Sequence, residues 1–516
     1  MKDHTPDSLC SLGRLRGSLR GVCALASTPR GGPLAALALI VLLFCTAAFG
    51  GVLRDGIRSL RTGACTRLEL RRAAIVGASN AVASTRAPPG SPIGVDSSPL
   101  AGMRVLLITH ELSATGAPRV CFELAQVLSS MGVDTRLAAQ DWTEPSAADR
   151  ICQFARTALP PTLTSLNFRC SPLSRPALAE GVIVVSTAVK RNALFISTFR
   201  EMYVSSAALV WWIHEGESVM NVLGEEALVQ ALTVLAAPGK LDAVLFVSDF
   251  CRRFWVDAAA ARGLSIIAPT FILRWGMPDW KRDALDAAVL NTRSLAALRS
   301  DFGFRDDDFV FLVLASYNHL KGHAGIVKAL MRANAQCPSS CRLRVLALGV
   351  ALSQPGGFPA QEMAWVLKHP DFRFRPAVDD VALYLAMSDA YVSNTKRGGE
   401  TWGLATLEAA IAGKAVLASG VGGTLEQLEH NVSALFHAVG PSDEEEVELA
   451  DHMCAIATDH VLAARLAAAA RENSRERLGQ AHLETELADL FGRFWQSRHI
   501  ADTAAAAAAA EIAASE

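Results

Sequence analysis

The sequence predicts an α/β protein made of two doubly wound halves. Short apolar runs that lack strict alternation recur along the chain, and such runs are typical of parallel strands buried on both faces. Several of them lead through a polar or glycine-bearing loop into a segment with apolar residues at helical spacing, which is the repeating unit of a doubly wound sheet. The pattern begins at Met103 and restarts at Asp308, so we expect two halves joined near residues 285 to 300.

The first half opens with the strand MRVLLITH, residues 103 to 110, and the loop ELSATGAP. Residues 119 to 132 then carry apolar side chains at helical spacing, and Gly132 ends this predicted helix. Further buried strands are predicted at residues 181 to 187, 208 to 215 and 242 to 248. We assign residues 102 to 290 to an N-terminal Rossmann-like domain.

The second half opens with the strand DFVFLVLASY, residues 308 to 317, and a helix at residues 325 to 333. Further strands are predicted at residues 342 to 349, 390 to 394 and 414 to 419. We assign residues 291 to 480 to a C-terminal Rossmann-like domain. Residues 481 to 498 have the spacing of a terminal helix that could pack across the two domains, and the alanine-rich residues 499 to 516 are expected to be disordered.

An uncharged apolar segment precedes both halves. Residues 33 to 53 would form a helix roughly 31 Å long, about the thickness of a bilayer core. We expect a single-pass signal-anchor here, after a basic tail at residues 1 to 32 and before a stem at residues 54 to 101 that is rich in Ala, Ser, Pro and Gly towards its end. A cleaved signal or an organelle transit peptide is the alternative, since the basic tail is rich in arginine and serine.

The anchor leaves the orientation of the protein open, because arginines flank it on both sides. The positive-inside rule slightly favours a cytosolic C-terminal side. A type II orientation would instead place the two halves in the lumen of the Golgi or the endoplasmic reticulum, which are the membranes that we expect. The reverse orientation would place them in the cytosol, and a plastid address is a further alternative. Asn431 starts the chain's only N-glycosylation sequon, so its modification would indicate a lumenal domain.

Composition excludes several classes of protein. The 516 residues suffice for two or three domains, and 51% hydrophobic against 19% charged residues fits a large core. A net charge of -2 gives no reason to expect a nucleic-acid partner. Eleven cysteines are too dilute for a disulfide framework. Cys337 and Cys341 lack the second pair or histidine cluster of a zinc site, so two unrelated thiols or a local disulfide between them remain.

The densest local pattern lies in residues 398 to 428. The predicted strand at residues 390 to 394 leads into a loop with Glu400, and Gly403 precedes a helix at residues 404 to 412. The next strand exits through a second glycine-rich loop, so two such loops lie at the carboxyl ends of neighbouring parallel strands, where open α/β sheets bind ligands. The amides and the dipole at the helix start favour an anion such as a diphosphate.

Two glutamates belong to this pattern. Glu408 lies one turn into the predicted helix, and a carboxylate beside an anion site is suited to a pair of hydroxyl groups, such as those of a ribose. Glu400, in the loop, could face a sugar. The alternative is that both are solvated glutamates at a helix end.

The whole segment resembles the signature of the retaining glycosyltransferases of family 4, which have the GT-B fold. The matching residues are Glu400, Trp402, Gly403, Glu408, Gly413 and the run Gly422-Gly423-Thr424-Leu425-Glu426. The resemblance extends from about residue 103 to residue 495 and is strongest from 308 to 440. Trp402 stands where phenylalanine is commoner and keeps the aromatic character.

The resemblance implies a role for each matching residue. Glu408 would bind the donor ribose, and Glu400 would contact the donor sugar and take part in catalysis. Backbone amides at Gly403 and Leu404 would bind the diphosphate. Thr401 and Trp402, between the glutamates, are assigned to the same donor site.

A second element of the family is a basic pair that binds the diphosphate and so stabilises the leaving group. In LASYNHLKGH, Lys321 matches the lysine of this pair, and the alternative is an ordinary surface lysine. The usual arginine is missing, because Ser316 and Leu320 occupy its two common places. Elsewhere in the sequence, Arg375 and Arg397 could substitute for it.

The N-terminal half contributes three further candidates through the same resemblance. Gly116 and Ala117, in SATGAPR, match the first loop of the family, which lies near the donor phosphate and the acceptor. His214, at the end of a buried strand, matches a histidine on the acceptor side and would orient donor or acceptor, although a lone histidine is more often structural. In FVSDFCRRFW, Ser248 is expected to cap a helix in a packing role.

The family reading implies transfer of a sugar from a nucleoside diphosphate sugar, as co-substrate, to a glycan, lipid or other hydroxyl acceptor. The acceptor would enter on the face that the diphosphate leaves, so no protein nucleophile is needed and the anomeric configuration is retained. Neither a cofactor nor a metal is expected. The acidic run from Asp306 to Asp308 precedes a strand and is predicted to be a solvated turn.

Three alternatives to a transferase stay open at the level of the sequence. A phosphorylase-like enzyme could use the same fold, and a non-catalytic protein that binds sugar nucleotides or glycans would tolerate the missing arginine. An NAD-dependent enzyme is disfavoured, because no GxGxxG follows the strand at residues 103 to 110.

Overall fold

The computed structural model describes residues 100 to 496 with gaps at 101, 110–115, 140–168, 171–180, 187–191, 194, 198–206, 350–359, 379, 397, 441–443 and 495. The chain divides into two compact units, residues 1 to 84 and 85 to 516, and every described residue belongs to the second. The predicted basic tail, membrane anchor and alanine-rich tail, with nearly all of the stem, lie outside the described residues.

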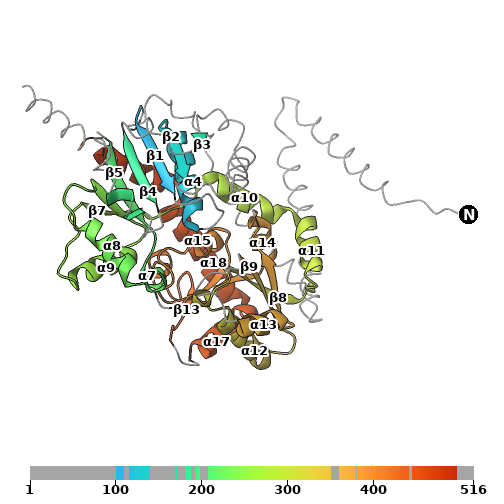
Figure 1. Ribbon diagram of the computed structural model, residues 1–516. Helices are drawn as coiled ribbons and strands as arrows, with labels where there is room; N and C mark the ends of the chain where they lie inside the picture. The colour runs from blue at the N-terminus through green and yellow to red at the C-terminus, as the bar shows by residue number, and fades with distance from the viewer. Residues whose placement is uncertain are drawn as a thin grey trace, which may run out of the picture. The chain divides into compact units, whose positions relative to one another are not determined.

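A seven-stranded parallel sheet forms the first half, with the strand order β3-β2-β1-β4-β5-β6-β7 (Figure 1). Its strands are β1 (Arg104–Thr109), β2 (Asp134–Ala139), β3 (Arg169–Cys170), β4 (Val182–Ser186), β5 (Ala208–Ile213), β6 (Ala243–Phe246) and β7 (Thr270–Ile272). The central strands β4, β5 and β6 are buried along their whole length, because helices cover both faces of a doubly wound sheet. In the register, Leu107 of β1 lies between Leu137 and Val184.

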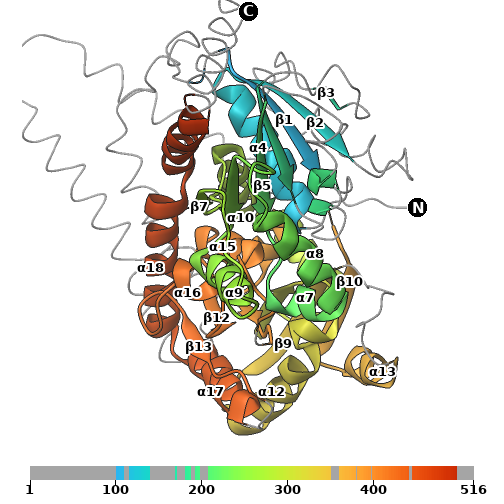
Figure 2. The ribbon, with the colours of Figure 1, turned by 60° about the vertical axis from the view of Figure 1, so that its left-hand side comes forward.

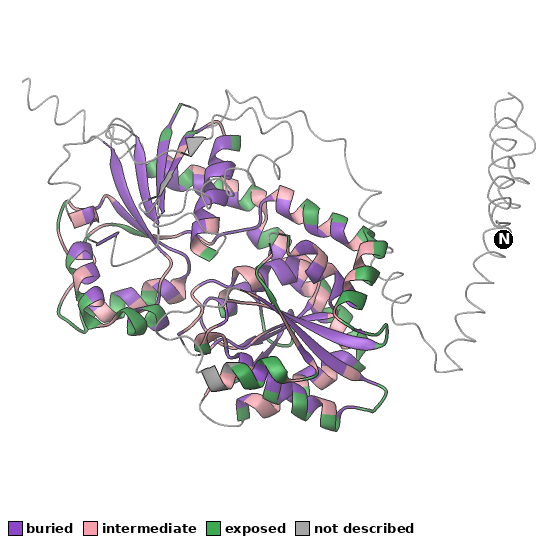
Figure 3. Cartoon of the chain, turned by 45° about the vertical axis from the view of Figure 1, so that its right-hand side comes forward, coloured by how far each residue is buried: buried purple, intermediate pink, exposed green. Residues whose placement is uncertain are grey.

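A six-stranded parallel sheet forms the second half, in the order β10-β9-β8-β11-β12-β13. Its strands are β8 (Asp308–Leu314), β9 (Arg342–Gly349), β10 (Phe372–Pro376), β11 (Ala390–Ser393), β12 (Ala415–Ser419) and β13 (Leu435–His437). Both strand orders reverse direction beside the first strand of the half, which is the topological switch point of a Rossmann-like sheet. Figure 3 shows that the strands of both sheets are largely buried, while exposed residues lie on the outer faces of the helices.

The described helices of the first half include α4 (Gly116–Ser130), α7 (Glu217–Leu223), α8 (Glu225–Leu235) and α9 (Asp249–Ala260). Two helices, α10 (Asp279–Leu290) and α11 (Thr292–Asp301), connect the sheets. The second half contains η3 (His319–Lys321), α12 (His323–Gln336), α13 (Ala360–Lys368), α14 (Ala382–Met387), α15 (Leu404–Ile411), α16 (Thr424–Gln427), α17 (Glu444–Thr458) and α18 (His460–Leu478). Helix α18 packs against α15, α17 and β12 (Figure 2).

The end of the chain returns to the first half. Residues 480 to 494 are helical and follow α18, where a terminal helix is expected from the sequence. The Phe494 ring packs edge-on against the Phe271 ring of β7, with 5.6 Å between the ring centroids. Leu487 and Phe491 of the same segment are fully buried. This segment therefore ties the second half of the chain to the first sheet by apolar burial.

These observations confirm the predicted class of two parallel, doubly wound α/β sheets. The expected helix cap is also confirmed, since the Ser248 hydroxyl accepts a hydrogen bond from the Cys251 amide, 3.0 Å away, at the start of α9. Within the described part of the chain, no single helix is long and apolar enough to cross a bilayer. The bent pairs α7 with α8 and α17 with α18 meet that criterion only when each pair is counted together.

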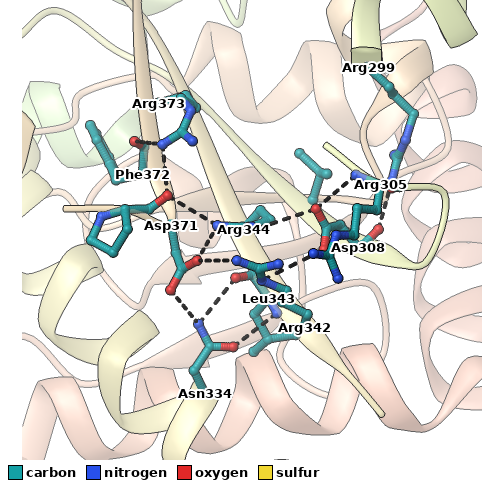
Figure 4. Close-up of polar contacts among 12 residues, drawn as sticks. Arg299, Arg305, Asp308, Asn334, Arg342, Leu343, Arg344, Asp371, Phe372 and Arg373 are labelled. Atoms are coloured by element: carbon teal, nitrogen blue, oxygen red, sulfur yellow. Dashed lines mark hydrogen bonds and ion pairs between the residues drawn. The ribbon is translucent and has the colours of Figure 1, made fainter. Parts of the chain in front are cut away.

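The predicted solvated turn at Asp306 to Asp308 is wrong for its last residue. Asp306 and Asp307 are exposed, but Asp308 begins β8 and is 2% exposed. Its carboxylate accepts hydrogen bonds from the Arg305 amide at 2.9 Å and the Arg344 guanidinium at 3.3 Å (Figure 4). Paired cations make this burial possible, so Asp308 has a structural role.

The expectation for the neighbouring cysteines is also wrong. Cys337, after α12, pairs with Cys454 of α17 in a disulfide, with a Cα–Cα distance of 5.6 Å. Cys341 is a separate buried thiol. Neither two unrelated thiols nor a disulfide between Cys337 and Cys341 describes this region, because the partner is 117 residues away in the sequence.

Candidate functional site

The loop that carries Glu400 follows β11 and is held by close backbone packing. The Gly423 amide donates a hydrogen bond to the Glu400 carbonyl at 3.1 Å. A Cβ atom on Gly422 would collide with that carbonyl, and one on Gly423 would collide with the Thr401 carbonyl. Gly422 also has a positive φ of 64°, which favours glycine. The two glycines of the motif are therefore required for the close approach of the loops that precede α15 and α16.

Two predicted catalytic side chains meet in an ion pair. The ammonium of Lys321, in η3, lies 2.9 Å from Glu400 Oε2, although the residues are 79 positions apart. Both side chains are about one-fifth exposed, at 22% and 19%. The pair lies beyond the carboxyl ends of the adjacent strands β8 and β11, where this fold binds ligands. Lys321 is thus placed beside the Glu400 loop.

A buried asparagine that the sequence analysis did not single out for a role joins the loops of Lys321 and Glu400. Asn394 Nδ2 donates to the Gly322 carbonyl at 3.1 Å, and Asn394 Oδ1 lies 3.0 Å from His437 Nε2. The Lys396 amide adds a hydrogen bond to the Leu320 carbonyl at 2.8 Å. Burial, with the charges of His452 and Lys396, lowers the pKa of His437 from 6.5 to about 3, so its imidazole is neutral at physiological pH.

His214 lies at the end of β5 and contacts both halves of the molecule. Its Nε2 is 3.2 Å from the Ser186 hydroxyl, which fixes the ring against β4. Its carbonyl accepts a 2.6 Å hydrogen bond from the Thr401 hydroxyl. The predicted residues His214, Thr401, Glu400 and Lys321 are therefore brought into one region, from both sheets.

Trp402 is a buried contact between the halves. Its side chain is 7% exposed, and the indole Nε1 donates to the Trp275 carbonyl at 2.9 Å. A phenylalanine could fill this space but could not donate that hydrogen bond. Gly403 then caps α15, and its carbonyl accepts from Gln427 Nε2 at 3.2 Å. The Leu404 amide, which is predicted to bind the diphosphate, here donates a 3.0 Å hydrogen bond to the Trp402 carbonyl of its own chain.

Glu408 is no solvated helix-end glutamate, because it is only 6% exposed. Its Oε1 lies 2.5 Å from Lys281 Nζ of α10 and 4.0 Å from Arg119 Nη1 of α4. Burial alone would raise the pKa of Glu408, but the charges of Lys281 and Arg119 outweigh it and hold the pKa below its ordinary value. Glu408 is therefore an ionised, charge-paired carboxylate at neutral pH.

Gly116 and Ala117 begin α4, one turn before Arg119. Gly116 is exposed, and a Cβ atom there would meet nothing within 4 Å. Because Arg119 reaches Glu408, the first turn of α4 lies on the same side of the site as the motif helix α15.

Arg375 and Arg397 are the two residues that could replace the missing arginine, and the structure describes only the first of them. The Arg375 guanidinium lies 5.8 Å and 5.7 Å from the ring centroids of Phe302 and Tyr384, in a cation–π arrangement. Arg397 lies outside the described residues. In the part of the chain that the structure describes, no three His, Cys, Asp or Glu side chains gather as a metal site would need.

Two family models match the chain. The model described as "Glycosyl transferases group 1" matches residues 296 to 475, which include Lys321 and both glutamates of the motif. The model described as "Glycosyl-transferase family 4" matches residues 101 to 235, which include Gly116 and His214. The family 4 model thus covers β1 to β5 of the first sheet, and the group 1 model covers all six strands of the second. No curated protein matches the sequence.

Solved structures resemble the chain over most of its length. HepE of Anabaena, crystallised with UDP and glucose, has a TM-score of 0.56 at 17% identity and covers 75% of this chain and 99% of its own. A glycosyltransferase of Rickettsia africae has a TM-score of 0.56 at 13% identity, covering 76% and 98%. Sucrose-phosphate synthase of Thermosynechococcus elongatus has 0.54 at 15%, covering 77% and 100%. At these identities the likeness shows the fold alone, and that fold is the expected GT-B arrangement.

Proposed function

The chain belongs to family 4 of the glycosyltransferases, and on this premise we propose that it transfers a sugar from a nucleoside diphosphate sugar to a hydroxyl acceptor with retention at the anomeric carbon. In this reaction the bond between the anomeric carbon and the diphosphate oxygen breaks. The acceptor oxygen forms its new bond to the same face of that carbon. The acceptor proton passes to the departing diphosphate, so no protein nucleophile is needed.

The observation that carries this proposal is the pair between Lys321 and Glu400. The diphosphate gains negative charge as it departs, and a fixed ammonium beside it lowers the barrier. The Glu400 carboxylate can accept hydrogen bonds from sugar hydroxyls, which would hold the donor sugar in its reactive position. Lys321 would then exchange a carboxylate partner for a phosphate partner when the donor binds.

A nucleotide donor is further supported by a structural relative. HepE of Anabaena has been crystallised with UDP and with UDP-glucose. We propose a nucleoside diphosphate sugar for this chain on the same fold, with Glu408 at the ribose, Gly403 and Leu404 at the diphosphate, and Gly116 and Ala117 facing the donor phosphate. Thr401 and Trp402 support that site through their bonds to His214 and Trp275. His214 is proposed to orient donor or acceptor.

We propose that the acceptor is a glycan or a lipid and that catalysis needs no metal. Residues 33 to 53 are proposed to anchor the enzyme to a membrane of the Golgi or endoplasmic reticulum, with the catalytic domains in the lumen. Asn431 and Val432 of the sequon are exposed on a turn, while Ser433 is buried, and the Asn431 side chain would be open to modification there. A mass shift that a glycosidase removes, and that Asn431→Gln abolishes, would support this placement.

The proposal is tested with full-length protein and a panel of nucleoside diphosphate sugars, scored by nucleotide release and by the anomeric configuration of the product in NMR spectra. We expect one donor to turn over, and Glu400→Gln to lower kcat by about 100-fold or more. Glu446→Gln, which alters a surface pair with Lys328, serves as the matched control and should leave kcat unchanged. An inverted product, or equal rates in the two variants, contradicts the proposal.

A second candidate is a non-catalytic protein that binds sugar nucleotides. Ser316 and Leu320 favour it, because they replace the arginine that would share the diphosphate charge with Lys321. The same assay separates the two functions. Tight donor binding without nucleotide release, over the whole donor panel and with glycan and lipid acceptors, would favour the binding protein.

A further inference from the structure

A buried ion cluster connects Glu408 to the first half of the molecule. The Lys281 ammonium lies 2.5 Å from Glu408 Oε1 and 3.0 Å from Glu123 Oε1. The Lys281 and Glu123 side chains are 8% and 2% exposed. Lys281 lies on α10 between the two sheets, Glu123 on α4 and Glu408 on α15, so a single ammonium bridges carboxylates from both halves.

Glu123 is itself fixed at both of its oxygens. Its Oε2 accepts a 2.9 Å hydrogen bond from the Trp275 indole, and its Oε1 accepts from Arg119 Nε at 3.2 Å as well as from Lys281. Two carboxylates and two cations balance in charge, which allows the group to be buried. The Trp275 carbonyl also accepts a hydrogen bond from the Trp402 indole, so Trp275 contacts both the ion cluster and the loop between Glu400 and α15.

Both cations lie nearest to the same oxygen of Glu408, which Lys281 contacts directly. Lys281 at 2.5 Å and Arg119 at 4.0 Å are both measured to Oε1. A carboxylate held by one oxygen presents the other in a fixed direction. It also stays ionised, and an ionised acceptor binds a hydroxyl more strongly than a neutral one does.

We propose that Lys281, backed by Glu123, is a positioning residue for donor recognition: it holds Glu408 by Oε1 so that Oε2 accepts hydrogen bonds from the ribose hydroxyls. This inference rests on the proposed function, because it assumes that Glu408 faces a ribose. It adds that recognition of the ribose depends on a residue of α10, outside the motif of the C-terminal half. Lys281 does not touch the donor.

A purely structural salt bridge would stabilise the protein without affecting which nucleotide is preferred. A positioning role makes a different prediction, since it concerns the ribose hydroxyls in particular. The two roles are separated by comparing a nucleotide with analogues that lack one hydroxyl group.

The experiment measures dissociation constants for full-length protein by calorimetry. The probes are uridine, guanosine and adenosine diphosphate, followed by the 2′-deoxy and 3′-deoxy forms of the tightest binder. In the wild type we expect loss of a hydroxyl to weaken binding by about ten-fold. In Lys281→Met the ratio of the Kd of the deoxy form to the Kd of the parent nucleotide should fall towards one, because Lys281 no longer holds the Glu408 carboxylate in place. Lys281→Arg should keep part of the ratio, and Lys328→Met, on the surface of α12, should keep all of it.

Several outcomes would overturn the inference. If Lys281→Met weakens all forms of the nucleotide by the same factor, the pair is only structural. If Lys281→Met does not fold, Lys281→Gln takes its place, since its amide can still be hydrogen-bonded but carries no charge to hold the Glu408 carboxylate; an unchanged ratio there is equally decisive. Failure of the proposed function looks different: the wild type would bind none of the three nucleotides, or Glu408→Gln would leave the ratio intact.

Discussion

At the scale of single residues, buried polar side chains set the positions of the two catalytic candidates. Asn394 is 2% exposed and His437 1% exposed, yet together they fasten the backbone next to Lys321 to the strand end before Glu400. A buried amide is costly unless it is hydrogen-bonded, so each of these bonds restricts the alternatives open to the loops. Exposed loops thereby gain the rigidity that a site needs.

The neutral state of His437 predicts a pH-dependent stability. Its pKa of about 3 in the folded protein lies below the ordinary 6.5, so on acidification the unfolded chain takes up the proton first. The stabilisation that follows from this lowered pKa is fully present above pH 6.5 and is lost as the pH falls towards 3. We expect His437 to account for about 2 kcal/mol of the free energy of unfolding lost between pH 7.5 and pH 5.

Urea unfolding of the full-length protein at several pH values measures this effect. His437→Gln should show a flatter pH dependence than the wild type, whatever its stability at neutral pH. The exposed His482→Gln is the matched control and should follow the wild type. Identical pH dependence in the two variants would show that His437 does not carry the effect.

The sequence identified some of these residues but not others. Lys321, Glu400 and Glu408 stand within recognisable local patterns, so their neighbourhood could be predicted. Their partners are distant: Lys281 is 127 positions before Glu408, as their numbers show. Such pairings are decided by how α4, α10 and α15 pack, which no local pattern encodes. The burial of Glu408 and its pairing with Lys281 could therefore not be predicted from the sequence. The local motif was enough to propose a ribose as its ligand.

At the scale of elements, the motif of the second half is a pair of loops packed backbone against backbone. Gly423 has ordinary helical dihedral angles, with φ −66° and ψ −15°, so its backbone would accept any residue. What requires glycine is the Thr401 carbonyl at the place where a side chain would begin. Gly422 is thus favoured by both its positive φ and close packing, whereas Gly423 is required by close packing alone.

Gly423→Ala should therefore disturb the site through packing alone. The added methyl group pushes the Thr401 carbonyl away, and we expect donor KM to rise by about ten-fold or more with a loss of 1–3 kcal/mol of stability, roughly the cost of overpacking. Donor kinetics and urea unfolding measure the two quantities. Gly492→Ala, in the last helical segment, meets nothing within 4 Å and should be neutral or slightly stabilising. Equal behaviour of the variants would rule out the packing argument.

The strands were predictable in proportion to their burial. The central strands β4, β5, β8 and β12 are continuous apolar runs, and each was expected from the sequence. Strand β2 was missed because DTRLAA mixes polar and small residues. Strands β7 and β13, of three residues each, were missed because they form by pairing with a neighbouring strand and carry almost no pattern of their own.

At the scale of the whole molecule, one segment of the second half both forms the candidate site and joins the halves. Thr401 bonds to His214, Trp402 to Trp275 and Glu408 to Lys281. A fourth contact follows in the same motif. Glu426 accepts hydrogen bonds from the Asp249 and Phe250 amides at the start of α9, at 3.1 Å and 2.8 Å, and pairs with Arg274 at 2.9 Å.

These contacts explain why donor binding and the arrangement of the two halves are expected to be coupled. A ligand that engages Glu400 and Glu408 acts on residues whose neighbours belong to the opposite sheet. The family resemblance predicted that two Rossmann-like halves would face a shared donor. It did not predict that the motif side chains would make the contacts between them, because the resemblance concerns the donor and not this chain's own interface.

The central claim is that the Glu400–Glu408 segment and Lys321 form a nucleotide-sugar site, and nucleotide affinity tests it most directly. The measurement is the Kd of full-length protein for uridine, guanosine and adenosine diphosphate, in the wild type, in Lys321→Ala and in the surface control Lys328→Ala. We predict that the wild type and Lys328→Ala bind one nucleotide equally well, and that Lys321→Ala binds it at least about ten-fold more weakly, because a charge-assisted contact to phosphate is lost. Equal affinity in all three proteins, or no nucleotide binding by the wild type, would contradict the claim.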